Sequence, residues 1–181
     1  MSLILSRRDL NFVLYEWLKV EQLTRIARYA DHSRETFDAA LDTCEKIATN
    51  LFAPHNKKND QHEPHFDGAT VTVIPEVKTA LKAFCNAGLM AAGQDYERGG
   101  MQLPLVVEKA GFAWFKGANI ATSAYPFLTI GNANLLLAHG SAAPPRYKKC
   151  LLRSLPPRGA TAMVWQSRST AKCRTTWEPV P

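Results

Sequence analysis

The sequence has few of the signatures that allow a function to be argued from motifs alone. It contains no P-loop, no GxGxxG turn and no GxSxG motif, so neither a phosphate-binding loop nor a serine nucleophile can be assigned. Its four cysteines show no CxxC or Cys/His spacing typical of a zinc site. Two of them, Cys44 and Cys85, fall on apolar faces of predicted helices, where we expect buried thiols.

Signals for export or membrane insertion are equally scarce. The apolar stretch before Arg7 is too short for a signal peptide. A transmembrane helix needs an apolar run of about 18 residues or more. The nearest candidate, Ile120–Ala138, is broken by Pro126 and by several hydroxyl and amide side chains. We therefore expect a cytoplasmic protein without a transmembrane segment.

The first 142 residues have no excess of charge of one sign, since their 14 Lys and Arg are nearly balanced by 15 Asp and Glu. The last 39 residues hold the other 8 basic residues and one acid, so the formal net charge of +6 belongs to them. Six of the 11 prolines lie there too, and the hydrophobic periodicity ends near residue 143. Such a segment cannot bury enough apolar surface to fold alone. We expect an irregular, disordered tail.

Helical periodicity is what the first 142 residues do contain, with almost no strand signal. A short amphipathic helix is expected over Asp9–Leu23. The clearest pattern follows Ser33, the expected N-cap, and continues to Pro54, which ends or kinks the helix. Its apolar stripe comprises Phe37, Ala40, Leu41, Cys44, Ile47, Ala48 and Leu51.

Proline and glycine set the bounds of the later helices. After a brief extended piece at 71–74, Pro75 stands at the expected first position of a helix that Gly88 stops. Pro104 begins a third helix through Phe115, and two further helices are expected over 119–125 and 129–139. The prediction is an all-α fold, a helical bundle with mostly short connections.

Histidines and acids crowd into one polar stretch between the helices. Its members are His55, Asp60, His62, Glu63, His65 and Asp67. The spacing lacks the helical geometry of an HExxH site, and Pro64 interrupts it. We interpret the stretch as a solvated loop and predict no metal site. Further along the chain, the two consecutive glycines Gly99 and Gly100 are explained by a turn between helices.

Several short motifs carry a resemblance through their order and spacing. They are Phe12-Val-Leu-Tyr-Glu-Trp-Leu18, Phe52-Ala-Pro-His-Asn56, Pro75-Glu-Val-Lys78, Ala87-Gly-Leu89, Tyr96-Glu-Arg-Gly-Gly-Met-Gln-Leu-Pro104, Leu136-Leu-Ala-His-Gly-Ser141 and Arg146-Tyr147. Together they resemble the N-terminal region of bacterial FAD-dependent acyl-CoA dehydrogenases, in the long subgroup that includes enzymes acting on 3-methylmercaptopropionyl-CoA. Gln102 departs from the family pattern, which usually has glycine there.

The resemblance implies an oxidoreductase of fatty acid metabolism. In this family a carboxylate removes the α proton of an acyl-CoA thioester while FAD accepts the β hydride, and an electron acceptor reoxidises the flavin. The N-terminal helices support a β-domain and help to close the acyl pocket. By position, that pocket would be lined by Ser123, Pro126, Phe127 and Ile130, although plain helix packing explains each equally well. If Phe127 faces the substrate, its bulk shortens the room for long acyl chains. A homo-oligomer is an open alternative.

The resemblance ends near residue 147. The family's β-domain motif has no match in Thr161–Thr170, and the C-terminal domain with the catalytic glutamate is missing, so we assign no catalytic or cofactor-binding residue. We expect a helical extension at 1–32, a helical domain at 33–147 and an unstructured basic tail at 148–181. We interpret the chain as the product of a truncated or frameshifted gene and expect it to be inactive alone. The alternative is a helical interaction module whose basic tail binds an acidic partner. Nucleic-acid binding through Trp165 and Trp177 is not expected, because the tail has no repeat or RNA-module signature.

Overall fold

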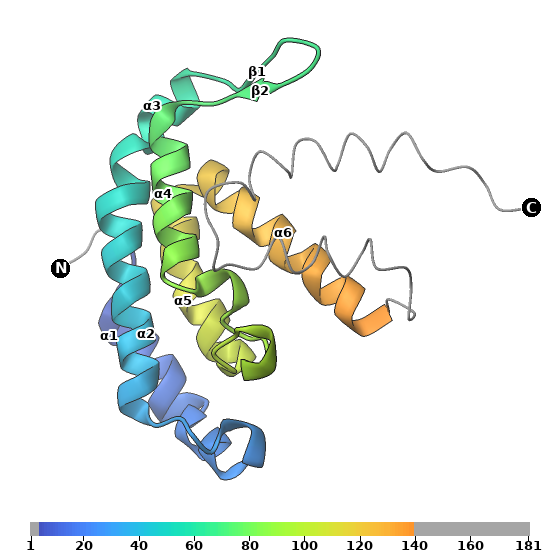
Figure 1. Ribbon diagram of the computed structural model, residues 1–181. Helices are drawn as coiled ribbons and strands as arrows, with labels where there is room; N and C mark the ends of the chain where they lie inside the picture. Colours follow the sequence, from blue (N-terminus) through green and yellow to red (C-terminus); the bar gives the residue numbers. More distant parts are fainter. Residues whose placement is uncertain (1–3, 140–181) are drawn as a thin grey trace, which may run out of the picture.

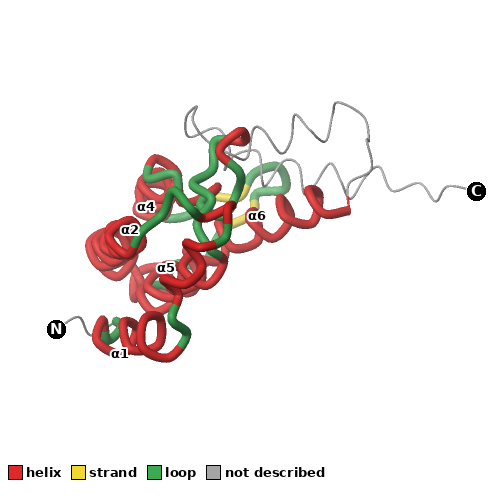
Figure 2. Tube along the Cα trace, turned by 90° about the horizontal axis from the view of Figure 1, so that it is seen from below, coloured by secondary structure: helices red, strands yellow, loops and turns green. Residues whose placement is uncertain are grey.

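The computed structural model describes residues 4–139, which are mostly helical, as the periodicity predicted (Figure 1). The long helices are α2 (Arg34–Ile47), α4 (Pro75–Asn86), α5 (Leu105–Ala118) and α6 (Ile120–His139). In Figures 1 and 2, α2 and α4 lie side by side against α5, and α6 runs obliquely away from them. The predicted tail, 148–181, lies outside the described residues, as do the motif residues beyond 139.

Helix α2 forms where its sequence predicted. The Ser33 hydroxyl accepts from the Thr36 amide, and the Thr36 hydroxyl accepts from the Ser33 amide, so the two residues form a capping box. After Ile47 the chain widens into a π-helical turn, Ala48–Phe52, followed by a 3-10 turn, Ala53–His55, and by α3 (Asn56–Gln61). Pro54 has no amide hydrogen and would clash with a carbonyl four residues earlier, which explains the wider turn before it.

The N-terminal segment differs from the single helix expected over Asp9–Leu23. It forms α1 (Arg7–Asn11) and a π-helical turn (Phe12–Trp17), and the left-handed conformation of Lys19, with φ of 50°, then breaks the helix. Two 3-10 turns follow, Val20–Arg25 and Ala27–Tyr29. The apolar side chains of this segment are only partly buried: Leu14 is 1% exposed, whereas Trp17 is 70% exposed.

Proline and glycine bound α4 and α5 as expected. Pro75 opens α4, and Gly88 follows it in the left-handed conformation with φ of 74°. Helix α5 continues three residues beyond the predicted Phe115. Between α3 and α4 the chain forms a hairpin of β1 (His65–Phe66) and β2 (Val71–Thr72), in which Phe66 pairs with Val71.

The prediction of two helices over 119–125 and 129–139 is wrong, because α6 continues through Pro126. A proline inside a helix removes one backbone hydrogen bond, here to the Thr122 carbonyl. The Thr129 hydroxyl donates to the carbonyl of Tyr125 across the same turn, at 2.9 Å. Packing of Pro126 in the interior outweighs the lost bond.

The core has two connected parts. One gathers α4, α5 and the π-helical turn around the rings of Phe52, Phe84, Phe112 and Phe115. The other packs Leu14 and Val20 of the N-terminal segment against Phe37 and Leu41 of α2. The segment before α2 is therefore part of the same core. Among residues 4–139, no helix combines the length and apolar character that a bilayer crossing requires.

Candidate functional site

Three of the four residues that the resemblance assigned to a pocket lie on the buried face of α6. Ser123, Pro126 and Ile130 follow one another at helical spacing, and Ser123 is 1% exposed. The Ser123 hydroxyl donates to the carbonyl of Ile120 at 3.0 Å, so its one hydrogen is already used. These side chains face the interior of the bundle.

Phe127 occupies the flank of α6 beside α5. It is 47% exposed, and its ring centroid lies 6.1 Å from that of Phe112. The Lys116 ammonium stands 4.6 Å from the centroid of the same ring, a cation–π geometry. Phe127 is thus half exposed beside α5, whereas Ser123, Pro126 and Ile130 are buried.

A shallow hollow between α5 and α6 contains two of the predicted residues. Its lining consists of Lys109, Phe112, Phe127, Ile130, Gly131 and Asn134, and its volume is about 50 Å³. A cavity of about 150 Å³ is needed to admit benzene. The hollow is therefore too small for an acyl chain, and the residues around it form at most one wall of a larger site.

The interior between α2, α4, α5 and α6 is well packed. An apolar cavity of about 20 Å³, beside Cys44 and Phe115, has room for about one water. Cys44 is buried, and burial raises the pKa of its thiol to about 12, while burial also raises the pKa of the Cys85 thiol. Both thiols are free and Cys85 is half-buried, which agrees with the prediction for Cys44 and partly with that for Cys85.

A buried polar cluster at the start of α6 was missed by the sequence analysis. His55 is 2% exposed, and its Nε2 lies 2.9 Å from the hydroxyl oxygen of Thr122, which is fully buried. Asn119 caps α6 by accepting from the Thr122 amide, and its side-chain amide donates to the carbonyl of Phe52. The Asn56 amide, which would be the partner of that carbonyl in an α-helix, donates instead to the Ala53 carbonyl in the 3-10 turn.

The interpretation of His55 as part of a solvated loop is therefore wrong. His55 follows Phe52 by three residues, so it continues the buried stripe of α2 and the turn after it. The other five residues of the polar stretch are exposed, on α3, on the hairpin and in the short segment between them. Among residues 4–139 no three His, Cys, Asp or Glu side chains gather as metal ligands. A histidine at helical spacing from a buried aromatic is the signal that could have identified His55.

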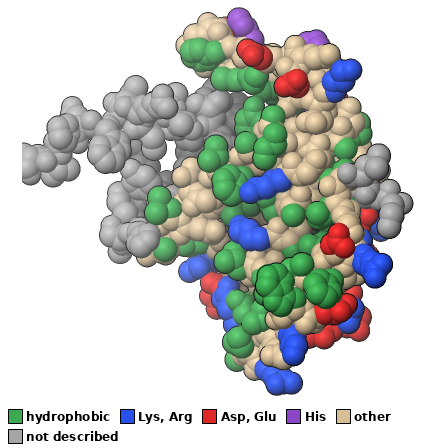
Figure 3. Space-filling model, turned by 180° about the vertical axis from the view of Figure 1, so that it is seen from behind, with side chains coloured by type: hydrophobic (Ala, Val, Ile, Leu, Met, Phe, Trp, Pro, Cys, Tyr) green, Lys and Arg blue, Asp and Glu red, His purple; other side chains and the backbone are tan. Residues whose placement is uncertain are grey.

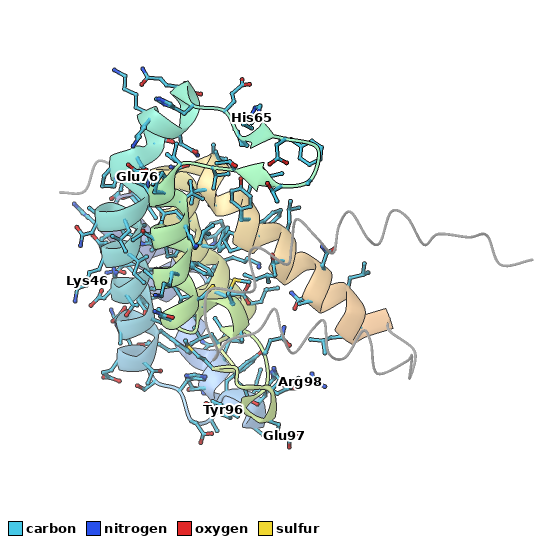
Figure 4. All side chains as sticks on the ribbon, turned by 45° about the horizontal axis from the view of Figure 1, so that its top comes forward. Lys46, His65, Glu76, Tyr96, Glu97 and Arg98 are labelled. Carbon is cyan, nitrogen blue, oxygen red and sulfur yellow. The ribbon has the colours of Figure 1, made fainter. Side chains whose placement is uncertain are left out.

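The loop that carries the Tyr96–Pro104 motif is fastened to the N-terminal segment at the end of the bundle opposite Glu76 (Figure 4). Asp95 pairs with Arg28 and Arg98, and the hydrogen bond from Arg28 lowers the pKa of the Asp95 carboxyl. Gly99 has φ of 76°, and a side chain at Gly100 would meet the Gln94 carbonyl. The turn predicted from the two glycines is thus confirmed.

Gln102, the departure from the family pattern, has a left-handed conformation with φ of 52°. Glycine takes this conformation without steric cost, which explains a preference for glycine there. In this chain the Gln102 side-chain amide donates to the Arg28 backbone carbonyl at 3.1 Å. The backbone carbonyl oxygen of Gln102 lies 3.2 Å from His32 Nε2. These contacts offset the strain.

Two curated proteins are similar in sequence to part of this chain. No family model matches the chain. A butyryl-CoA dehydrogenase of Syntrophomonas wolfei subsp. wolfei (strain DSM 2245B / Goettingen) is 30% identical over 138 residues, which are 74% of this chain and 22% of the relative. A second butyryl-CoA dehydrogenase of that organism is 33% identical over 86 residues, 45% of this chain and 14% of the relative. These similarities support an acyl-CoA dehydrogenase-like relationship. The chain spans about a fifth or less of the length of these relatives.

Proposed function

We propose that residues 33–147 act as the N-terminal helical domain of an FAD-dependent acyl-CoA dehydrogenase, with residues 1–32 as an extension packed against it. The observation that supports this most is the similarity to a butyryl-CoA dehydrogenase over 138 residues. The outer face of α6 gives independent support, because three large apolar side chains there are 58 to 63% exposed: Ile120, Leu128 and Leu135. Exposed apolar surface of this kind is typical of a face that another part of a protein covers.

In this proposal α6 forms one wall of the acyl pocket. Ser123, Pro126 and Ile130 hold the wall rigid because they are packed in the interior. Phe127, on the flank, limits the length of the acyl chain. FAD, when bound to the whole enzyme, supplies the acceptor of the β hydride. The two hollows to which α5 and α6 contribute, of about 20 and 50 Å³, are too small for a flavin. The role of α6 is to orient the acyl chain and exclude water.

The proposal includes a change of reading frame after about residue 147. It is supported by the sequence beyond that point, where 8 basic residues of the last 39 accompany one acid and the β-domain motif has no match. Sequencing of the downstream DNA tests this directly. If no frame encodes the β-domain motif, the frameshift is ruled out.

Expression with the frame restored tests the enzymatic role. We expect a yellow protein whose flavin absorbance bleaches when butyryl-CoA is added, and Phe127→Ala should raise the rate on longer acyl-CoA thioesters relative to butyryl-CoA. The matched control is Phe66→Ala on the hairpin, which should leave this ratio unchanged. A colourless protein without bleaching would contradict the role. Salt-sensitive binding of the present chain to nucleic acid would favour the interaction module instead.

A further inference from the structure

Lys116, near the end of α5, contacts two aromatic rings. Its ammonium nitrogen lies 4.6 Å from the centroid of the Phe127 ring and 5.7 Å from that of the Phe112 ring. Lys116 follows Phe112 by four residues, so the two side chains share one face of α5. A lysine ammonium at such distances is attracted by the negative charge on the faces of the rings. The contact therefore links α5 to Phe127 of α6.

The surroundings of Lys116 provide no carboxylate that would compete with the rings. The one acid of α5, Glu108, pairs with Lys109 at 2.6 Å. Helix α6 has no charged side chain between Ile120 and Ala138. Within residues 4–139, Lys116 takes part in no ion pair. Its ammonium is thus available for the cation–π contact.

Of the two rings, Phe127 is the one whose position Lys116 can influence. Phe112 is 6% exposed and belongs to the core, whereas Phe127 is half exposed. An aromatic side chain on a helix takes χ1 near 180° or near −60°. The observed rotamer places the Phe127 ring 6.1 Å from that of Phe112, beside Lys116, and a change to the other rotamer moves the ring away from this position. Removal of the ammonium should therefore make that change easier.

We propose that Lys116 is a positioning residue whose ammonium holds the Phe127 ring at the hollow between α5 and α6, and thereby sets the limit on acyl-chain length. The inference rests on the proposed function, in which the Phe127 ring provides that limit. Lys116 acts through the ring and not by contact with the substrate. A preference for short acyl chains then depends on a charge on α5 as well as on an aromatic side chain on α6.

The first test measures the χ1 rotamers of Phe127 in the present chain from three-bond NMR couplings. We expect one dominant rotamer. Lys116→Gln should raise the ratio of the minor to the major rotamer about two- to fivefold, the effect of losing one exposed cation–π contact. Lys116→Arg keeps the cation and should restore the ratio. Lys109→Gln is the matched control, because Lys109 lines the same hollow but pairs with Glu108, and it should leave the ratio unchanged.

The second test uses the enzyme with the frame restored. Lys116→Gln should raise the rate on longer acyl-CoA thioesters relative to butyryl-CoA by no more than about fivefold, in the same direction as Phe127→Ala. Lys116→Arg should restore the ratio of rates. In a Phe127→Ala background, Lys116→Gln should change nothing further, because its effect passes through the ring.

The outcomes separate this inference from the function on which it rests. If Phe127→Ala leaves the ratio of rates unchanged, the proposed role of α6 is wrong, and the limit on chain length falls with it. If Phe127→Ala raises the ratio but Lys116→Gln does not, the role of α6 stands and that of Lys116 is overturned. Unchanged rotamers in Lys116→Gln, or an equal change in Lys109→Gln, would overturn it as well.

Discussion

Helices α2 and α6 both pack on α5, but they present different surfaces to solvent. The outer face of α2 is polar, with Glu35, Asp42 and Lys46 exposed. The outer face of α6 carries exposed Ile120, Leu128 and Leu135. On the rear of the molecule (Figure 3), hydrophobic side chains likewise appear in several groups among Lys and Arg side chains. Thus α2 has completed its packing within this chain, whereas α6 keeps an apolar face that another surface can cover.

The largest expected difference between the two helices concerns a pair of phenylalanines. Phe37 of α2 is fully buried, so Phe37→Ala should lower the free energy of unfolding by about 3–5 kcal/mol. Phe127 of α6 is 47% exposed, so Phe127→Ala should cost about 1 kcal/mol or less. Urea denaturation measures both. Equal losses would mean that the outer flank of α6 is already packed.

The helix caps give a second pair. Ser33→Ala removes an accessible cap of α2 and should cost about 1 kcal/mol. Asn119→Ala removes a buried cap of α6 and leaves the Phe52 carbonyl without its partner, so we expect about 2–3 kcal/mol. The comparison fails if thermal or urea unfolding gives the exposed cap the larger effect.

Two glycines, one where α5 contacts α2 and one on α6, should respond differently to replacement by alanine: the first change should lower the free energy of unfolding and the second should raise it. A side chain at Gly111 of α5 would lie 2.8 Å from the Cys44 sulfur of α2, so Gly111→Ala should cost about 1–3 kcal/mol. Gly131→Ala on α6 meets nothing within 4 Å and should stabilise the helix by about 0.5–1 kcal/mol. A double-mutant cycle with Cys44→Ala isolates the clash. If the shorter side chain does not relieve the cost of Gly111→Ala, the close contact between α2 and α5 is not its cause.

The smallest expected difference is in pH dependence. The pKa of the Glu35 carboxyl is lowered, first by a hydrogen bond from the Ser33 hydroxyl and then by its own backbone amide. A lowered pKa stabilises the fold above the unfolded value, about 4.3 for Glu, and this stabilisation is lost as the pH falls below it. NMR shifts of the first-turn amides of α2 should therefore move below about pH 4.3, while those of α6 stay constant. Glu35→Gln should abolish the response of α2, and a response that persists in this variant would exclude Glu35 as its source.

Prediction from sequence succeeded where a helix has clearly separate polar and apolar faces. In α2, polar residues alternate with an apolar stripe at a period of 3.6, so the buried face and the start after Ser33 followed from the sequence. The same reasoning failed in α6, because an apolar residue on every side leaves the buried face undefined. It also failed at Pro126, where the expected break is absent.

The candidate site likewise combines features that the sequence predicted with features that it did not. Ser123, Pro126 and Ile130 share one face because α6 continues through Pro126, which the sequence did not predict. The separation of Phe127 onto the flank depends on α5, since Phe112 and Lys116 hold its ring there. His55 was misread because its partner Thr122 lies 67 residues away in the sequence.

The sequence by itself determined α4 and α5, the start of α2 with its capping, and the turns at Gly88 and Gly99, because these depend on interactions between residues a few positions apart. Only the tertiary structure decided that α6 is continuous, that the segment before α2 joins the core, and that His55 is buried against Thr122. Each of these rests on contacts between segments distant in the chain, where packing and hydrogen bonding outweigh local preference.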